Sequence, residues 1–282
     1  MILHPVENSW YDIGTKRTFS FDTSGMFVDK YGKTPQIGFN NDYKFGDWLH
    51  SYVQQRLITE GLLVKMVGKC SPIFYSPKAF DSPKKLLLLI CGSGRILAGL
   101  WSVGVCAYRG LDAGSVLPCL TEAKKRDMEV IIFNPNHPNS SSNHTSEIFR
   151  QLIVPSNPDR VWILAHSMGG DSTCNIIAEN PQFCIQHVEA FALTDGCEKR
   201  VRAEGFRIGK WCLLKGVNWV RSEAEVNKTL GEGDATIHRS AQTSDHPLTT
   251  FMAFRYIWEF FDENGANDVK SPQLPENFIG VE

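Results

Sequence analysis

Ser167 stands in a sequence pattern that favours nucleophilic chemistry. Residues 161–164 form an apolar run typical of a buried strand, and residues 165–170 then read Ala-His-Ser-Met-Gly-Gly before a helical segment. This is the pattern of a nucleophile elbow, a sharp strand-to-helix turn that lifts the serine hydroxyl above a sheet. Small residues are needed two positions before and after the serine. Ala165 and Gly169 meet that need, although glycine is usual at the first position, and the pattern also fits an ordinary strand-to-helix loop.

Asp195 is the candidate for the acid that would orient a catalytic base. An elbow serine needs a base to accept its proton and an acid to hold that base in the right tautomer, in the chain order serine, acid, histidine. Residues 188–194 read as the next buried strand, so Asp195 falls at its C-terminal end, where open α/β sheets place their chemistry. Asp195-Gly196 also favours a plain turn, and both interpretations stay open at this point.

His246 is the candidate base. It lies in the polar loop at residues 243–247, directly before a strongly apolar helix predicted for residues 248–261, and a loop histidine there reaches back over the sheet. His238 competes for the role, but its neighbours read as a strand or a sheet edge, where a histidine usually faces solvent. His166 is expected to point into the structure or toward a neighbouring loop, because consecutive residues at such a turn diverge.

The backbone N–H groups of Gly92, Ser93 and Met168 are the candidate oxyanion hole. Such a hole needs donors aimed at developing negative charge. Residues 85–90 form the most apolar strand and run directly into Cys-Gly-Ser-Gly, while Met168 follows the serine at the start of its helix, where the helix dipole adds to the field. A Gly-Ser-Gly loop also occurs in phosphate-binding sites, but no Lys-Ser or Lys-Thr follows it, and no complete dinucleotide fingerprint is present.

Alternating strands and helices must position these residues. Alternation of this kind predicts an α/β fold in which a mostly parallel sheet, antiparallel at its beginning, is covered by helices on both faces. The predicted strands are residues 62–67, 73–75, 86–90, 130–133, 161–165, 188–194 and 218–222. The predicted helices are residues 43–60, 116–125, 146–153, 168–179 and 247–264, while residues 211–214 fit either a helix or a strand.

The length of 282 residues fits one domain with a full core. Residues 1–40 are expected to form an irregular or short-stranded N-terminal extension that packs on the main sheet. Residues 41–265 make up the predicted domain, and residues 266–282 a loose, proline-containing tail.

Charge and cysteine usage limit the classes of partner. The formal net charge of −2 gives no field that would attract nucleic acid, and Lys124-Lys125-Arg126 reads as a solvated helix end. The 8 cysteines show no CxxC pair or close metal spacing, so reduced core residues are predicted, with no metal and no cofactor. The first residues lack a signal sequence and no apolar run has the length of a membrane span, so we expect an intracellular protein that is neither secreted nor bound to a membrane.

The ordered set of motifs resembles the Arb2 domain family. The likeness covers roughly residues 20–265 and is greatest to the animal cotranscriptional regulators of that family, which also contains a fungal Argonaute-binding protein and a C-terminal domain of fungal class II histone deacetylases. The motifs that carry it are the strand ending in Cys-Gly-Ser-Gly at 91–94, Ala-Gly-Leu-Trp at 98–101, Phe-Asn-Pro-Asn at 133–136, the elbow at 165–170, Leu-Thr-Asp at 193–195, Asn-Trp-Val at 218–220 and the helix after His246.

This resemblance implies an α/β-hydrolase-like fold used in small-RNA-linked silencing or cotranscriptional control. It implies Argonaute-type, chromatin or splicing proteins as partners, in the nucleus, the cytoplasm or both. Ser167, Asp195 and His246 match the family's triad-like positions, so the alternative is a serine hydrolase acting on a carboxylic ester or related acyl substrate. Two departures stand out: Cys91 where the family pattern has histidine, and a short segment between Asn136 and Val161.

Overall fold

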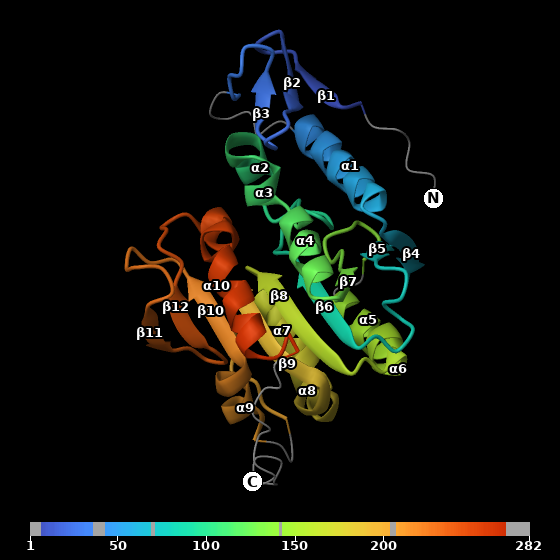
Figure 1. The fold of residues 1–282 in the computed structure, drawn as a ribbon, viewed down its shortest axis with the longest axis vertical. Helices are drawn as coiled ribbons and strands as arrows, with labels where there is room; N and C mark the ends of the chain where they lie inside the picture. Colours follow the sequence, from blue (N-terminus) through green and yellow to red (C-terminus); the bar gives the residue numbers. More distant parts are fainter. Residues whose placement is uncertain (1–6, 36–42, 69–70, 141–142, 204–206, 269–282) are drawn as a thin grey trace.

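The computed structural model describes residues 7–35, 43–68, 71–140, 143–203 and 207–268. A large mixed sheet forms the body of the molecule, and a small three-stranded sheet lies at one end beside helix α1 (Figure 1). Most of the C-terminal tail predicted for residues 266–282 lies outside the described residues.

The large sheet contains nine strands in the order β11-β12-β10-β9-β8-β6-β7-β5-β4. The pairs from β7 to β12 are parallel, whereas β4, β5 and the far edge strand β11 pair antiparallel, as predicted for the start of the sheet. The strands are β4 (Leu63–Val67), β5 (Ser71–Tyr75), β6 (Lys85–Ile90), β7 (Glu129–Ile132), β8 (Arg160–His166), β9 (Val188–Thr194), β10 (Gly216–Val220), β11 (Thr229–Glu232) and β12 (Ile237–Ser240).

Helices cover both faces of this sheet, which confirms the predicted α/β class. Successive side chains of a strand point to opposite faces: Leu87 and Leu89 of β6 pack with the helices α4 and α10, while Leu86 and Leu88 pack with η2, α7, α8 and α9. The helices are α1 (Tyr43–Thr59), α2 (Val103–Arg109), α3 (Leu111–Gly114), α4 (Leu117–Lys125), α5 (His144–Ile148), η2 (Phe149–Ile153), α6 (Val154–Ser156), α7 (Gly169–Glu179), α8 (Pro181–His187), α9 (Ile208–Lys215), η3 (His246–Leu248) and α10 (Thr249–Glu263).

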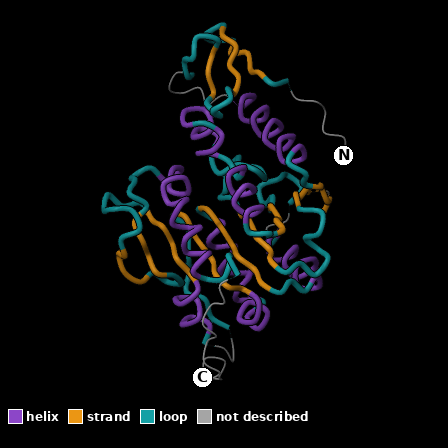
Figure 2. The backbone as a smooth tube through the Cα atoms, viewed as in Figure 1, coloured by secondary structure: helices purple, strands orange, loops and turns teal. Residues whose placement is uncertain are grey.

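The N-terminal residues form a separate antiparallel sheet of three strands, β1 (Ser9–Asp12), β2 (Arg17–Phe21) and β3 (Phe27–Asp29). Its aromatic side chains pack against α1 and α2 rather than against the large sheet. Figure 2 shows the two sheets apart, with helix between them. The short strands are therefore present as predicted, but the surface that they cover is helical.

The order of strands brings the predicted site residues to one edge of the sheet. Ser167 follows β8, Gly92 follows β6 on one side of it, and Asp195 follows β9 on the other. Parallel strands end at the same edge, where α/β sheets bind ligands. None of the helices in the described residues is long and apolar enough to span a membrane.

Candidate active site

Ser167 has the strained backbone of a nucleophile elbow. Its φ is +54°, a left-handed conformation that is rare for a residue with a side chain. Its N–H donates to the carbonyl of Thr194 (3.1 Å) and its carbonyl accepts from the N–H of Cys197 (2.9 Å), so the turn is held on both sides. A Cβ on Gly169 would lie 2.7 Å from the carbonyl oxygen of Ile90, which explains why only glycine fits there.

The loop after β6 passes directly beside the serine. A Cβ on Gly92 would lie 2.7 Å from the Cβ of Ser167 and 3.3 Å from its Oγ. The absence of a side chain at Gly92 therefore gives the serine hydroxyl its space, and it brings the backbone of the predicted oxyanion loop next to the nucleophile.

Asp195 and His246 meet across the end of the sheet. His246 Nδ1 lies 2.5 Å from Asp195 Oδ2, although 51 residues separate them in the sequence. Burial raises the pKa of Asp195, but the hydrogen bonds from His246 and from the backbone N–H of Arg221 offset that, and the net pKa lies below its ordinary value. Asp195 is therefore a carboxylate at neutral pH, and it holds the imidazole by Nδ1.

Ser167 Oγ makes no hydrogen bond within the described residues, so the structure brings the acid to the base but shows no contact between the base and the serine. The Nε2 of His246 is the nitrogen left for that contact, and in unliganded enzymes this bond often tightens only when substrate binds.

His166 stacks on His246 with the ring centroids 4.7 Å apart, and it is buried, as predicted. Burial lowers the pKa of His166 to about 4, so its ring presents no charge to His246 at neutral pH.

The N–H groups of Gly92, Ser93 and Met168 donate to no acceptor in the described parts of the chain. Each lies beside Ser167, either on the loop that Gly92 brings against its Oγ or in the next position along the chain. Unpaired N–H groups at this place are the arrangement that an oxyanion hole requires.

Asn136 holds this loop in shape, a role that the sequence did not predict. Its Nδ2 donates to the carbonyls of Gly92 (2.5 Å) and Ile96 (2.7 Å). It also lies 3.7 Å from the Sγ of Cys91. The sequence feature that could have indicated this role is the position of Asn136 just after a buried strand. Burial raises the pKa of the Cys91 thiol to about 12, so Cys91 stays a neutral thiol behind the loop.

Two further residues support Asp195. Asn218 pairs its side-chain amide with Gly196, accepting from its N–H and donating to its carbonyl, both at 3.0 Å. Arg221 places its Nε 2.6 Å from Asp195 Oδ2, the oxygen that also contacts His246. Both lie on or just after β10, the strand next to β9, and only their three-dimensional proximity to Asp195 reveals them.

His238, the competing candidate, makes its contacts away from Asp195. It lies on β12 with its Nε2 2.7 Å from Glu198 Oε1, and this hydrogen bond raises its pKa. Glu198 also accepts from the Thr236 hydroxyl, so the cluster ties β12 to the loop after β9. The preference for His246 over His238 thus agrees with the contacts of Asp195.

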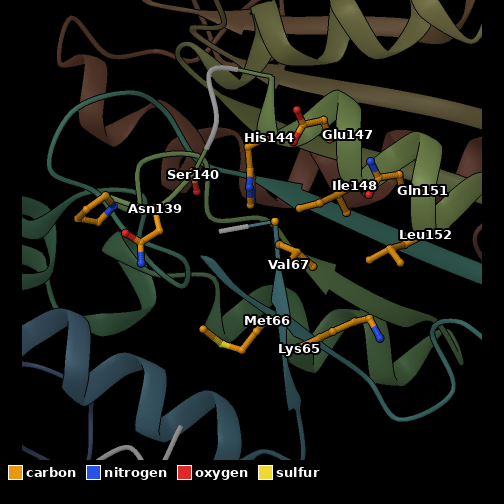
Figure 3. Close-up of a pocket in the computed structure, with 12 residues that line it drawn as sticks. Lys65, Met66, Val67, Asn139, Ser140, His144, Glu147, Ile148, Gln151 and Leu152 are labelled. Atoms are coloured by element: carbon orange, nitrogen blue, oxygen red, sulfur yellow. The ribbon is translucent and has the colours of Figure 1, made fainter. Parts of the chain in front are cut away.

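Two cavities lie on the same side of the sheet. One of about 310 Å³ is lined by Gly92, Ser93 and Met168 at one end and continues along α7. Another, of about 680 Å³, is larger but lies between strand β4, the loop at 138–140 and the helices α5 and η2 (Figure 3). None of Ser167, Asp195 and His246 lines the larger one. None of the three lines the smaller cavity either, but Gly92 and Met168 do, and they lie directly beside Ser167, so this is the cavity that begins next to the serine.

Comparison with known proteins shows which family part of the chain resembles. Residues 62–139 match the model of the Arb2 domain. The matched segment includes the predicted oxyanion loop and Asn136 but ends before Ser167. The chain is 22% identical over 268 residues to the cotranscriptional regulator ARB2A homolog of Dictyostelium discoideum, covering 73% of this chain and 69% of that protein. It is 25% identical over 266 residues to the human cotranscriptional regulator ARB2A, covering 72% of this chain but only 64% of that protein.

Solved structures support the fold alone. A histone deacetylase from Saccharomyces cerevisiae aligns with a TM-score of 0.54 at 10% identity, covering 77% of this chain and 98% of that one. The histone deacetylase Clr3 aligns with a TM-score of 0.51 at 13% identity, covering 82% of this chain and 42% of that one. Together with the elbow after the central strand, these comparisons confirm the resemblance drawn from the sequence motifs. The chain thus has an α/β fold similar to these structures, matches the Arb2 domain model over residues 62–139, and is similar along most of its length to proteins named cotranscriptional regulator ARB2A.

Proposed function

We propose that this chain is a regulatory domain of cotranscriptional control that acts by binding proteins. The observation that carries this proposal is its similarity over 72–73% of its length to two proteins named cotranscriptional regulator ARB2A. Argonaute-type, chromatin or splicing proteins are the proposed partners, in the nucleus, the cytoplasm or both. A fold does not determine a function, so the proposal rests on homology and not on the sheet.

Affinity purification tests this role. The full chain and its Ser167→Ala variant are each used as bait in native extract, and bound proteins are identified by mass spectrometry against a bait-free control. Recovery of the same Argonaute, chromatin or splicing proteins by both baits is expected, because a scaffold does not need the hydroxyl. Repeated recovery of none of these classes by either bait contradicts the proposal.

The Asp195–His246 contact beside a strained elbow serine favours a second function, that of a serine hydrolase for carboxylic esters or related acyl compounds. Ser167 Oγ would attack the acyl carbonyl while His246 Nε2 takes its proton, and the carbonyl oxygen would gain negative charge facing the N–H groups of Gly92, Ser93 and Met168. His246 would then give the proton to the departing alcohol. Water would attack the acyl-serine, again losing a proton to His246, which releases the acid and restores Ser167.

Labelling with a fluorophosphonate probe tests the hydrolase function. Intact mass is measured for wild-type protein and for Ser167→Ala after incubation with the probe. Stoichiometric labelling of wild type alone is expected, since the probe reports an activated and accessible serine. Absence of labelling in correctly folded wild type, or equal labelling of the variant, would contradict the hydrolase function and leave the binding role as the remaining proposal.

A further inference from the structure

The cavity beside the serine is a narrow polar groove along α7. It begins at Gly92, Ser93 and Met168 and reaches Glu179 at the other end of that helix. The 11 residues of α7 span about 16 Å. A volume of about 310 Å³ spread along that length leaves room for one extended chain rather than for a compact or bulky group.

The walls of the groove offer hydrogen-bonding groups that have no partner among the described residues. Thr145 is only 6% exposed and lines the groove, and its hydroxyl makes no hydrogen bond to any described residue. Ser146, Ser172 and the Asn143 side chain also line it without a partner in the parts of the chain that the structure describes. Hydroxyl and amide groups that line a groove in this way can bond to water or to a hydrophilic ligand. These groups favour a hydrophilic occupant and disfavour an aliphatic one.

The charge in the groove is negative. No lysine or arginine lines it, whereas Asp171 and Glu179 do. Asp171 is already engaged, because Oδ1 lies 2.9 Å from Lys199 Nζ and Oδ2 accepts from Asn175. Glu179 has no ion pair among the described residues, and it stands at the end of the groove far from the serine. A cation at the tip of a bound chain would therefore meet Glu179.

We propose that this groove is the substrate-recognition site of the Ser167 hydrolase, and that it binds a short hydrophilic chain, with amide or hydroxyl groups along its length and an ammonium group at its end. A peptide-like segment of about four or five extended residues matches the span. The inference rests on the proposed hydrolase function, because the groove begins at the candidate oxyanion hole.

Paired probes test it. Two fluorophosphonates with the same reactive group are compared, one carrying a polyamide chain of about 16 Å that ends in an ammonium, the other a decyl chain. The rate of Ser167 labelling is followed by intact mass. The polyamide probe is expected to label wild type faster. Thr145→Val, which keeps the shape and removes the hydroxyl, is expected to reduce that advantage.

The charge is tested separately. An acetamide-ended polyamide probe replaces the ammonium-ended one, and Glu179→Lys is compared with Glu263→Gln, an exposed change outside the groove lining. Wild type and Glu263→Gln are expected to prefer the ammonium by about twofold to fivefold, as exposed ion pairs do, and Glu179→Lys is expected to lose or invert that preference. Faster labelling by the decyl probe, or an unchanged preference in Glu179→Lys, overturns this inference but not the hydrolase. If no probe labels Ser167, both are wrong.

Discussion

At Ser167 and Asp195 the backbone conformation indicates a functional site as much as the side chains do. Both have positive φ, +54° and +43°, and such a conformation costs a residue with a side chain about 1–2 kcal/mol. The turns are anchored by Thr194 and Trp219, whose carbonyls accept the N–H groups of Ser167 and Asp195. Strain of this kind persists where the surrounding structure enforces it and is common at functional sites. Two strained residues directly after neighbouring strands therefore support a functional role for this edge of the sheet.

Adding one methyl group at Gly92 tests whether the candidate oxyanion loop is part of the site. In Gly92→Ala the new Cβ would lie 2.7 Å from the Cβ of Ser167, so either the serine or the oxyanion loop must move. Misplacing one oxyanion donor costs about 10²–10³ in rate, and fluorophosphonate labelling of Gly92→Ala should slow by at least about tenfold. Ser93→Ala is the matched control, because it keeps the backbone N–H and should label as wild type does. Equal rates for wild type and Gly92→Ala would show that the loop is not part of the site.

Among the elements, α4 and α10 are tied by an ion pair that the sequence did not suggest. Arg126, expected at a solvated helix end, is largely buried and makes two parallel contacts to Asp262, at 2.6 and 2.7 Å. Its guanidinium also stacks over Trp258, 4.6 Å from the ring centroid. The pair joins α10, which follows His246 directly, to the helix before β7. It therefore fixes the C-terminal end of α10 against α4.

Asp262→Ala should destabilise the protein by about 1–2 kcal/mol, because it removes the bidentate partner of the Arg126 guanidinium, which then keeps one ion pair, with Glu122 at 2.6 Å. Glu259→Ala lies on the same helix and removes an exposed pair with Arg255, so it should change stability by less than about 0.5 kcal/mol. Urea unfolding of both variants measures the difference in the free energy of unfolding. Equal values for the two would mean that the Arg126 pair contributes no more than a surface contact.

The sequence predicted helices and strands well where hydrophobic periodicity was strong. It predicted them poorly where contacts between distant segments determine the local structure. The strand β9 matches its predicted bounds, and α7 begins within one residue of them. The predicted helix at 146–153 is present as part of a longer helical run that passes through α5, the π-turn η2 and α6, while α8 and the edge strand β11 carried no clear signal. In the site, chain order and strand ends suggested Asp195 and His246. Asn136 and Asn218 stand in motifs that the sequence analysis quoted, but their roles, and that of Arg221, could not be predicted because those roles come from neighbours across the sheet.

Three buried histidines make the stability of the whole molecule sensitive to acid. His50 and His144 each accept a backbone N–H through Nε2, from Leu97 at 3.2 Å and from Asn134 at 3.3 Å. His166 lies between Trp101 and His246 under the serine. Burial lowers the pKa of all three to about 4 from the ordinary 6.5. The three histidines lie in different parts of the fold. Protonation of each one therefore destabilises the packing around it.

The free energy of unfolding should therefore decrease as the pH falls from about 6.5 toward 4. In that window the unfolded chain binds protons that the folded chain excludes, and each histidine contributes a slope of up to about 1.4 kcal/mol per pH unit. The pKa values of Asp195 and Glu198 are lowered in the folded chain. These two groups therefore add to the loss of stability only when the pH approaches their ordinary pKa values of 3.8 and 4.5. His238 acts in the opposite direction, because Glu198 raises its pKa, and its stabilising effect is lost as the pH rises above 6.5.

Urea unfolding between pH 7.5 and 5 measures this slope. His50→Gln keeps an acceptor for the Leu97 N–H and cannot be protonated in this range, so its stability should decrease less steeply than that of wild type. His238→Gln serves as the comparison, because it removes a histidine whose pKa is shifted the other way and should leave the slope below pH 6.5 unchanged. A flat stability profile in wild type over this range would mean that the three rings accept protons without leaving their places in the fold.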